Sequence, residues 1–391
     1  MPDAIGNVLP VGPERSYINL QQAAAHAQAG DTLLFDPGVY PGDQSISALQ
    51  GRADRYIYLL AADKGSVVIS GGQTGWHFSD VHYLHIEGFV FAEQTGNGLN
   101  VDDGSDYTLP AHHISIINCT FRDIRATGNS DLLKLSGVDD FQVMDCRFEN
   151  GAKGGSGIDM VGCHRGSIGR CRFTNMGSNS IQAKGGSDHI SIFRNHFKDG
   201  GQRTLNLGGS TGLPYFRPAN APFEAADLQV YSNIIVGSDA PIAFAGSVRV
   251  LVAHNTIIDP GTWVIRILQE TVDEERFLAC GDNVFQNNLI YYSNIRTEVN
   301  IGAHVRTESF SFLGNLWYNA ADPAARPQLP VEDPQMIYGE DPLFVDLESG
   351  DLHLQSASPA GAKTATVSGV EVDFYGRPFA DKPTIGAICR E

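Results

Sequence analysis

The sequence predicts an all-β protein built as a parallel β-helix, a solenoid in which each turn of the chain stacks on the previous one. Three observations predict this fold. Short segments of alternating apolar residues recur along most of the 391-residue chain. Turn-forming residues separate these segments, with 43 glycines in total. The recurring part shows no helical period, so strands rather than helices are expected to form the repeat.

The repeated segment carries apolar residues on both sides of one Cys or Asn, as in "IINCTF", "IFRNHF" and "FQNNLI". The spacings between these residues run from 22 to 38, and most are in the twenties. This period is typical of a parallel β-helix, and the leucine-and-asparagine consensus of a leucine-rich repeat is missing. The repeated positions are Cys119, Cys146, Cys171, Asn195, Asn233, Asn255, Asn288 and Asn315.

The Cys and Asn residues at these positions are suited to stacking on one another in successive coils. Each coil advances by one strand spacing, roughly 4.8 Å, so equivalent residues form ladders in which Asn amides can hydrogen-bond to one another. The first three rungs use Cys, a small residue that buries well. Their side chains point the same way, which is poor geometry for a disulfide. We therefore expect all six cysteines, including Cys163, Cys280 and Cys389, to be free thiols.

We expect one domain over residues 1–391, with regular coils from about 77 to 320. Residues 16–40 predict a short Ala-rich helix followed by the first strand, and this helix is expected to cover one end of the solenoid. The Pro- and Asp-rich part from about 320 to 391 breaks the repeat and is expected to fold back over the other end.

The net charge of -18 argues against a nucleic-acid or anionic-membrane partner. No apolar run reaches the roughly 18 residues that a membrane-spanning helix requires. The N-terminal residues lack the charged-then-apolar pattern of a signal peptide. We expect either an extracellular or periplasmic protein whose leader has been removed, or an intracellular one.

Each coil carries a further strand after the Cys/Asn segment, and its alternation predicts which residues point outward. The outward columns are polar over the middle coils and then turn apolar. Lys134 and Asp159 lie on neighbouring rungs, where they form either part of a site or a surface ion pair of little energetic value. One column reads Asn100, Lys134, Asp159, Gln182, Asn206, Ala243 and Arg266, and the next reads Asp102, Ser136, Val161, Lys184, Gly208, Ala245 and Leu268.

Long insertions, at 102–113, 208–227 and 269–282, flank these columns. Long loops on a solenoid usually line a binding face. Tyr215 and Arg217 join an aromatic ring to a cation, which suits sugar rings and carboxylates; the alternative is that the aromatic residues simply anchor the loop on the solenoid. The sequence thus predicts a groove that binds an acidic polysaccharide or oligosaccharide.

Two stretches resemble known families. "AAAHAQAGDTLLFDPGVY" and the ending "DPLFVD…IGAI" are similar to the pectate-lyase-like right-handed β-helix superfamily. The stretch from "NSIQAKGG" to "LNLGG" resembles the chondroitinase-B and alginate lyase family, and this resemblance places Lys184 on the family's catalytic lysine. Gly208 stands where the family has a catalytic arginine, and Asn179 where it has an acidic residue associated with calcium binding. We expect no cofactor; calcium remains the alternative, although the sequence offers no clear ligand set for it.

The resulting hypothesis is β-elimination. A lyase removes the proton beside a uronate carboxylate and expels the glycosidic oxygen, which requires a base, a cation for the carboxylate and an acid. Lys184 is the candidate base if burial or neighbouring cations lower its pKa. The candidate cations are Lys134, Arg203 and Arg217, and the candidate acids are Tyr215 and His189. Further substrate contacts are expected from Gln182, Asn206, Arg266 and Asn100.

Two alternatives remain. A glycoside hydrolase needs two carboxyl groups, roughly 5–5.5 Å apart for retention or 6.5–9.5 Å for inversion. Asp159 is the obvious first carboxylate, Asp102 is displaced along the strand, and Asp131 and Asp188 lie at turns near the same face. The lack of a clear pair favours a lyase. The other alternative is a non-catalytic glycan-binding or structural β-helix.

Overall fold

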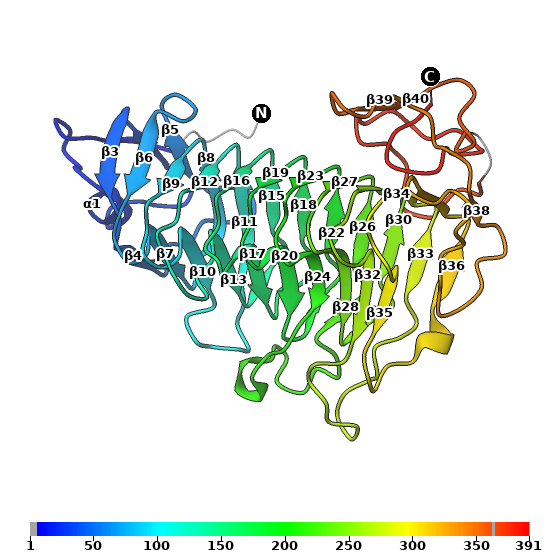
Figure 1. Cartoon of the computed structure of the whole chain (residues 1–391). Helices are drawn as coiled ribbons and strands as arrows, with labels where there is room; N and C mark the ends of the chain where they lie inside the picture. Colours follow the sequence, from blue (N-terminus) through cyan, green and yellow to red (C-terminus); the bar gives the residue numbers. More distant parts are fainter. Residues whose placement is uncertain (1–5, 362–363, 391) are drawn as a thin grey trace.

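The structure, a computed structural model, describes residues 6–361 and 364–390. Its strands stack in three long parallel sheets, and successive coils follow one another along the axis of the molecule (Figure 1). The predicted parallel β-helix is confirmed. Each regular coil contributes one strand to each sheet, which we call A, B and C in the order in which the chain visits them.

Sheet A has 13 strands, and they are β1 (Val8–Val11), β2 (Thr32–Phe35), β5 (Ile57–Ala61), β8 (His82–Glu87), β11 (Ala111–Ile117), β14 (Val138–Asp139), β15 (Gln142–Met144), β18 (Ser167–Gly169), β22 (Ser191–Phe193), β26 (Gln229–Tyr231), β30 (Leu251–Ala253), β33 (Val284–Gln286) and β36 (Ser311–Leu313). Sheet B has 12 strands, and they are β3 (Gly38–Pro41), β6 (Val67–Ser70), β9 (Val90–Ala92), β12 (Thr120–Arg122), β16 (Arg147–Glu149), β19 (Arg172–Thr174), β23 (His196–Lys198), β27 (Ile234–Val236), β31 (Thr256–Ile258), β34 (Leu289–Tyr292), β37 (Leu316–Asn319) and β38 (Ile337–Tyr338).

Sheet C has 10 strands, and they are β4 (Gln44–Ser47), β7 (Trp76–Ser79), β10 (Leu99–Asp102), β13 (Leu133–Ser136), β17 (Ser156–Val161), β20 (Asn179–Lys184), β24 (Arg203–Gly208), β28 (Ala240–Ala245), β32 (Ile265–Leu268) and β35 (Val299–Ile301). The remaining elements are the small sheet β21 (Ser187–Asp188), β25 (Ala225–Ala226) and β29 (Ser247–Val248), the antiparallel pair β39 (Phe344–Asp346) and β40 (Asp351–Leu354), and the helices α1 (Leu20–Ala24), η1 (Leu213–Tyr215) and η2 (Thr307–Ser309). Within the described ranges, no helix has the length and apolarity that crossing a bilayer requires.

The repeated Cys/Asn segment differs from the single strand that the sequence suggests. It is two short strands, one in sheet A and one in sheet B, joined by a corner. The residue before each Cys or Asn has a positive φ, for example 56° at Arg194 and 52° at His254. This left-handed residue turns the chain from sheet A to sheet B, so the Cys/Asn position points into the core at the corner.

The corner forms the predicted ladder. Each Asn side-chain amide donates to the Oδ1 of the next Asn, with distances of 3.1 Å from Asn195 to Asn233, 2.9 Å from Asn233 to Asn255 and 3.0 Å from Asn255 to Asn288. At the last rung Asn315 donates to Oδ2 of Asp333 at 3.0 Å, which ends the ladder on a carboxylate. The Cys rungs are buried free thiols, and all six cysteines are unpaired as expected.

A second ladder consists of aromatic rings in sheet B. The rings of Phe91, Phe121, Phe148, Phe173 and Phe197 stack with centroid separations of 4.6 to 5.0 Å. Each ring is fully buried, so one apolar core runs through the coils. Stacked identical side chains lock the register of neighbouring coils, because a slip by one residue would turn every ring outward.

The coils start earlier than residue 77, because β2, β3 and β4 already form one. The strand β1 precedes the predicted helix and pairs with β2. Helix α1 is only five residues long, contacts β1 and β4, and buries Leu20 and Ala23 in the core. Its function as a block against end-to-end association stays a prediction.

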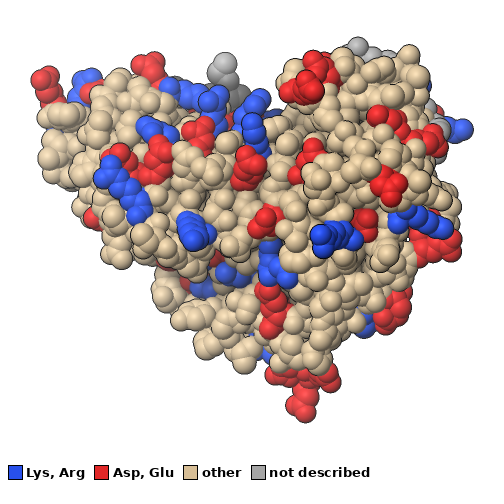
Figure 2. Space-filling view, viewed as in Figure 1, with Lys and Arg blue, Asp and Glu red and all other residues tan. Residues whose placement is uncertain are grey.

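The C-terminal part lies differently from the expectation. Residues 329–336 contact the core of the last coils, but the described residues of 344–361 and 364–390 lie along the flank of sheet B (Figure 1). Its Phe344, Leu352 and Ile388 form a cluster with Ile234, Leu289 and other outward apolar residues of β27 to β37. Figure 2 shows acidic and basic side chains intermixed over the visible face.

Candidate active-site groove

The outward columns of sheet C are arranged as the sequence predicts. Asn100, Lys134, Asp159, Gln182 and Asn206 occupy consecutive rungs of one column, followed by Ala243 and Arg266. In the next column, Asp102 pairs with Ser136, Ser136 with Val161, and Val161 with Lys184. The side chains of neighbouring coils are therefore one strand spacing apart along this face.

Two lysines share one buried carboxylate at the centre of this face. Lys134 Nζ donates to Oδ2 of Asp159, and Lys184 Nζ lies 3.3 Å from Oδ1. The contact of Lys184 lacks hydrogen-bond geometry, so Oδ1 has no hydrogen-bond donor within the described part of the chain. Lys184 instead donates to Oε1 of Gln182 at 3.2 Å. The Asp159 side chain is 1% exposed, and those of Lys134 and Lys184 are 22% and 15% exposed.

A second buried carboxylate, Asp131, lies 3.7 Å from Lys134 Nζ. Burial raises its pKa, and the charge of Asp159 adds to this effect, so that the value reaches about 6 in spite of the lysines. Burial lowers the pKa of Lys134, but the charges of Asp159 and Asp131 outweigh it and the net shift is upward. The two shifts have different main causes, which are burial for Asp131 and the charges of the two carboxylates for Lys134. Lys134 is thus held in its cationic form.

Replacement of Asp131 should change the pH dependence of stability. The pKa of Asp131 is higher in the folded state than its ordinary value of 3.8, so the folded protein holds this proton more tightly. The free energy of unfolding should fall by up to about 3 kcal/mol as pH rises from about 4 to about 6. In Asp131→Asn this decrease should be absent, and stability at pH 7 should rise, because the amide oxygen still accepts from the backbone of Ser156. Urea titrations at several pH values measure the free energy of unfolding of both proteins. If this free energy changed with pH equally in both, the raised pKa of Asp131 would be contradicted.

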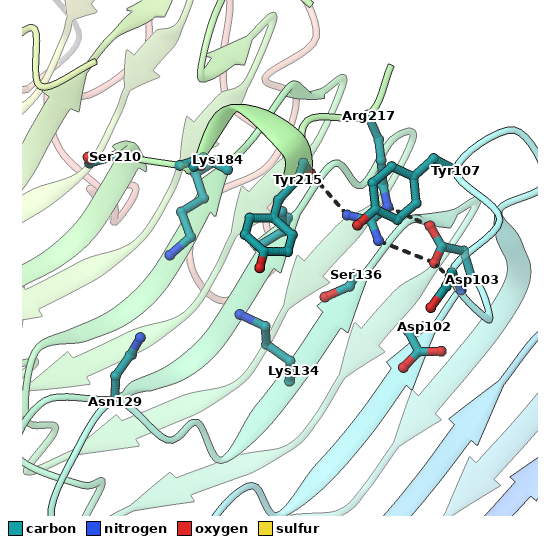
Figure 3. A pocket seen from close by; sticks show the side chains of 14 residues that line it. Asp102, Asp103, Tyr107, Asn129, Lys134, Ser136, Lys184, Ser210, Tyr215 and Arg217 are labelled. Atoms are coloured by element: carbon teal, nitrogen blue, oxygen red, sulfur yellow. Dashed lines mark hydrogen bonds and ion pairs between the residues drawn. The ribbon is translucent and has the colours of Figure 1, made fainter. Parts of the chain in front are cut away.

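The lysines line a cavity of about 460 Å³ between sheet C and the long loops. Figure 3 shows the Nζ atoms of Lys134 and Lys184 and the hydroxyl of Tyr215 directed toward the same space. Tyr215 lies at the end of η1, is largely exposed, and has no hydrogen bond from its hydroxyl among the described residues. Its hydroxyl is therefore available to a ligand.

Arg217 lines the first cavity and also holds two loops together. Its guanidinium pairs with Asp103, with Nη2 at 3.2 Å from Oδ1, and lies 3.9 Å from the centre of the Tyr107 ring. Both members of the ion pair are buried. Arg217 therefore fixes the loop after β24 against the loop after β10, and these two loops form one wall of the cavity.

Glu224 anchors the same loop beside Lys184. This fully buried carboxylate accepts from the backbone N–H of Gly185 at 2.8 Å and from the N–H and hydroxyl of Thr211 at 2.8 and 2.7 Å. The hydroxyl of Thr271 donates to it as well, at 2.6 Å. Four donors satisfy the buried charge, and the network fixes the backbone directly after Lys184.

A second cavity of about 330 Å³ continues the groove toward the C-terminal coils. It shares Asn129, Lys184 and Ser210 with the first cavity, so the two are parts of one groove. Its other polar residues include Gln182, Arg203, Asn206, Arg266 and Glu270. Arg203 donates to Glu270 at 2.6 Å and to Asn206 at 3.3 Å.

Gly208 and Asn179, the two positions that differ from the pattern of the lyase family, both have a clear place in the structure. Gly208 has φ +112°, and a Cβ there would lie 1.9 Å from the carbonyl oxygen of Ala245, so no side chain fits. Asn179 is buried and donates to Ser156 Oγ at 3.2 Å. No group of three or more His, Cys, Asp or Glu side chains suited to hold a metal ion occurs in the ranges that the structure describes.

The other predicted residues lie at the margins of the groove. His189 is mostly exposed, pairs with Asp188 at 3.0 Å, and lines neither cavity. Asn100 donates to Asp102 at 3.2 Å, and His77 contacts the same carboxylate at 2.6 Å. This pairing raises the pKa of His77 through its hydrogen bond to Asp102. The carboxylates that a hydrolase would use are thus all engaged by neighbouring side chains.

Sequence reasoning missed Asp103, Tyr107, Asn129, Glu224 and Glu270. All five lie in loops, turns or just beyond a strand end, where strand alternation gives no information. One signal in the sequence could have indicated such a residue. Glu224 is a charged residue in a loop segment, "APFEAAD", that is otherwise rich in small and apolar residues.

Comparison with solved structures supports the fold. Pectate lyase Pel9A superposes with a TM-score of 0.67 and 14% identity over 99% of this chain and 97% of that one. The complex of XylC with xylose superposes with a TM-score of 0.56 and 11% identity over 98% of each chain. An alginate lyase from Paenibacillus sp. str. FPU-7 gives a TM-score of 0.48 and 16% identity over 77% of this chain and 99% of that one. No protein-family model and no curated protein matches the sequence. The chain therefore shares the right-handed parallel β-helix fold of pectate lyase Pel9A.

Proposed function

We propose that this protein is a lyase that cleaves a uronate-containing polysaccharide or oligosaccharide by β-elimination in the groove of sheet C. The observation that carries the proposal is the pair of lysines over Asp159, with the Tyr215 hydroxyl facing the same cavity. The fold is one that also carries a pectate lyase, Pel9A.

In this proposal the two lysines have different roles, because their contacts with Asp159 differ. Lys134 is the fixed cation, because it donates to Asp159 and its pKa is raised. It binds the substrate carboxylate and stabilises the negative charge that develops there. Lys184 has the weaker contact with Asp159, at 3.3 Å, and is therefore the lysine that can exchange a proton with a substrate.

Lys184 and Tyr215 then carry the two proton transfers. Lys184 Nζ, in its neutral form, takes the proton from the carbon beside the carboxylate. The electron pair of that C–H bond forms the new C=C bond as the bond to the glycosidic oxygen breaks. The departing oxygen takes a proton from the Tyr215 hydroxyl. The proton that Lys184 has gained then returns to the Tyr215 oxygen through water, so both groups regain their starting forms.

A screen on uronate polymers tests the proposal. The protein is incubated with polygalacturonate, alginate, hyaluronate and chondroitin sulfate, while ultraviolet absorbance and reducing ends are followed together. Elimination yields a conjugated unsaturated uronate, so we expect both signals to rise in step on at least one polymer. Reducing ends without absorbance would show hydrolysis and reject the lyase. Binding without either signal would indicate a non-catalytic glycan-binding protein.

A further inference from the structure

The groove contains a further cation, Arg266, which lies outside the group formed by Lys134, Lys184 and Asp159. Lys134 and Lys184 contact Asp159, Arg203 pairs with Glu270, and Arg217 pairs with Asp103. No carboxylate of the described residues forms an ion pair with Arg266, which lines the second cavity on β32. A substrate anion that binds Arg266 therefore displaces no existing ion pair.

The guanidinium of Arg266 is fixed with one edge open. Its Nε donates to Oδ1 of Asn300 at 3.0 Å, and its Cζ lies 4.6 Å from the centre of the Trp263 ring. Within the described ranges, neither Nη1 nor Nη2 makes a hydrogen bond, so both are free to bind the two oxygens of a carboxylate. Burial lowers the pKa of Arg266, and repulsion from Arg203 adds to this effect, whereas the charge of Glu270 partly opposes it.

The side-chain amide of Asn206 adds a hydrogen-bond donor to the same cavity. Asn206 is 2% exposed, and its Oδ1 accepts from Arg203, but its Nδ2 has no hydrogen-bond partner among the residues that the structure describes. Beside Lys184, the charged groups among the described residues of this cavity are Arg203, Arg266 and Glu270. Since Glu270 pairs with Arg203, the charge of Arg266 stays available to an anion.

The position of Arg266 sets the kind of substrate. Arg266 is on β32 and Lys184 is on β20, so the two residues are three strands of sheet C apart. At one strand spacing per rung, this separation is roughly 14 Å. A single sugar ring cannot reach both, so the two sites would hold different sugars of one chain.

We propose that Arg266, with the Asn206 amide two coils away in the same cavity, forms a second anion subsite that binds a carboxylate several sugars away from the cleaved bond. The preferred substrate is then a chain with acidic groups on successive sugars, and a dimer is too short to reach the subsite. The position of the subsite relative to the cleaved bond rests on the proposed function. The binding of an anion by Arg266 can be measured without cleavage.

Binding in a protein with the base removed tests this inference. In the Lys184→Ala background, calorimetry with galacturonate and mannuronate oligomers gives the affinity without turnover. We expect Arg266→Gln to weaken binding of a hexamer about tenfold and to leave binding of a dimer unchanged, whereas Arg266→Lys should lose less. Arg249→Gln, which removes the same charge from a pair with Asp227 outside both cavities, is the matched control and should change neither.

Tryptophan fluorescence locates the effect. The chain has three tryptophans, and Trp76 and Trp317 are each 1% exposed, so a change on hexamer binding reports Trp263. Equal hexamer affinity in Arg266→Gln and its parent would overturn the subsite, as would an equal loss for the dimer. Binding that depends on Arg266 without elimination by the unchanged protein would keep the subsite and reject the lyase. A lack of binding to every oligomer would overturn both.

Discussion

Lys184→Ala is expected to lower kcat on the polymer that the protein cleaves by about 10²–10⁴-fold, the usual contribution of a general base. Among the described residues, Lys184 Nζ hydrogen-bonds only to Gln182, and Asp159 keeps its partner Lys134 when Lys184 is removed. The midpoint of unfolding should therefore change little. Initial rates of absorbance increase at saturating substrate, measured beside thermal unfolding, give both quantities.

Lys198→Ala is the matched control for this experiment. Lys198 is an exposed lysine on β23 in sheet B, and it lines neither groove cavity. Its removal should leave kcat unchanged. Full activity in Lys184→Ala would refute the base assignment, and a loss of equal size in Lys198→Ala would show that the effect is not specific to the groove.

Asn255→Ala should cause a large loss of stability. The Oδ1 of Asn255 accepts from both the backbone N–H and the side-chain amide of Asn233, at 3.0 and 2.9 Å. Its own amide donates to Asn288 and to the carbonyl oxygen of Val230. An alanine leaves the buried backbone N–H of Asn233 without its acceptor and removes one donor each from Asn288 and Val230. The cost should be about 2–5 kcal/mol.

Urea denaturation measures this loss as a lower midpoint of unfolding. Asn294→Ala provides the control, because Asn294 is exposed and its amide only donates to Ser293 at 3.2 Å. We expect a change within about 0.5 kcal/mol for the control. Equal midpoints for the two variants would mean that the ladder contributes no stability beyond that of a surface amide.

Much of the repeat could be predicted because its signals are local. Alternation in a strand fixes which residues point outward, so the columns containing Lys134, Asp159 and Lys184 follow from the order of residues along each strand. The spacing of Asn195, Asn233 and the other ladder residues defines the coils in the same way. A signal for the C-terminal cover was also present. The outward positions of sheet B change from charged residues, Arg147 and Arg172, to apolar ones such as Ile234 and Leu289, where the last segment packs.

The sequence by itself determined the solenoid, its ladders and the face on which the two lysines lie, because each follows from residues a few positions apart or one coil apart. The tertiary structure alone decided what surrounds these lysines. Arg217 meets Asp103 across 114 residues, and Glu224 fixes the backbone after Lys184. These contacts join loops whose paths depend on the whole stack of coils, so no local period encodes them. The same holds for Arg266, whose lack of an ion-pair partner among the described residues becomes visible only when every nearby carboxylate has been placed.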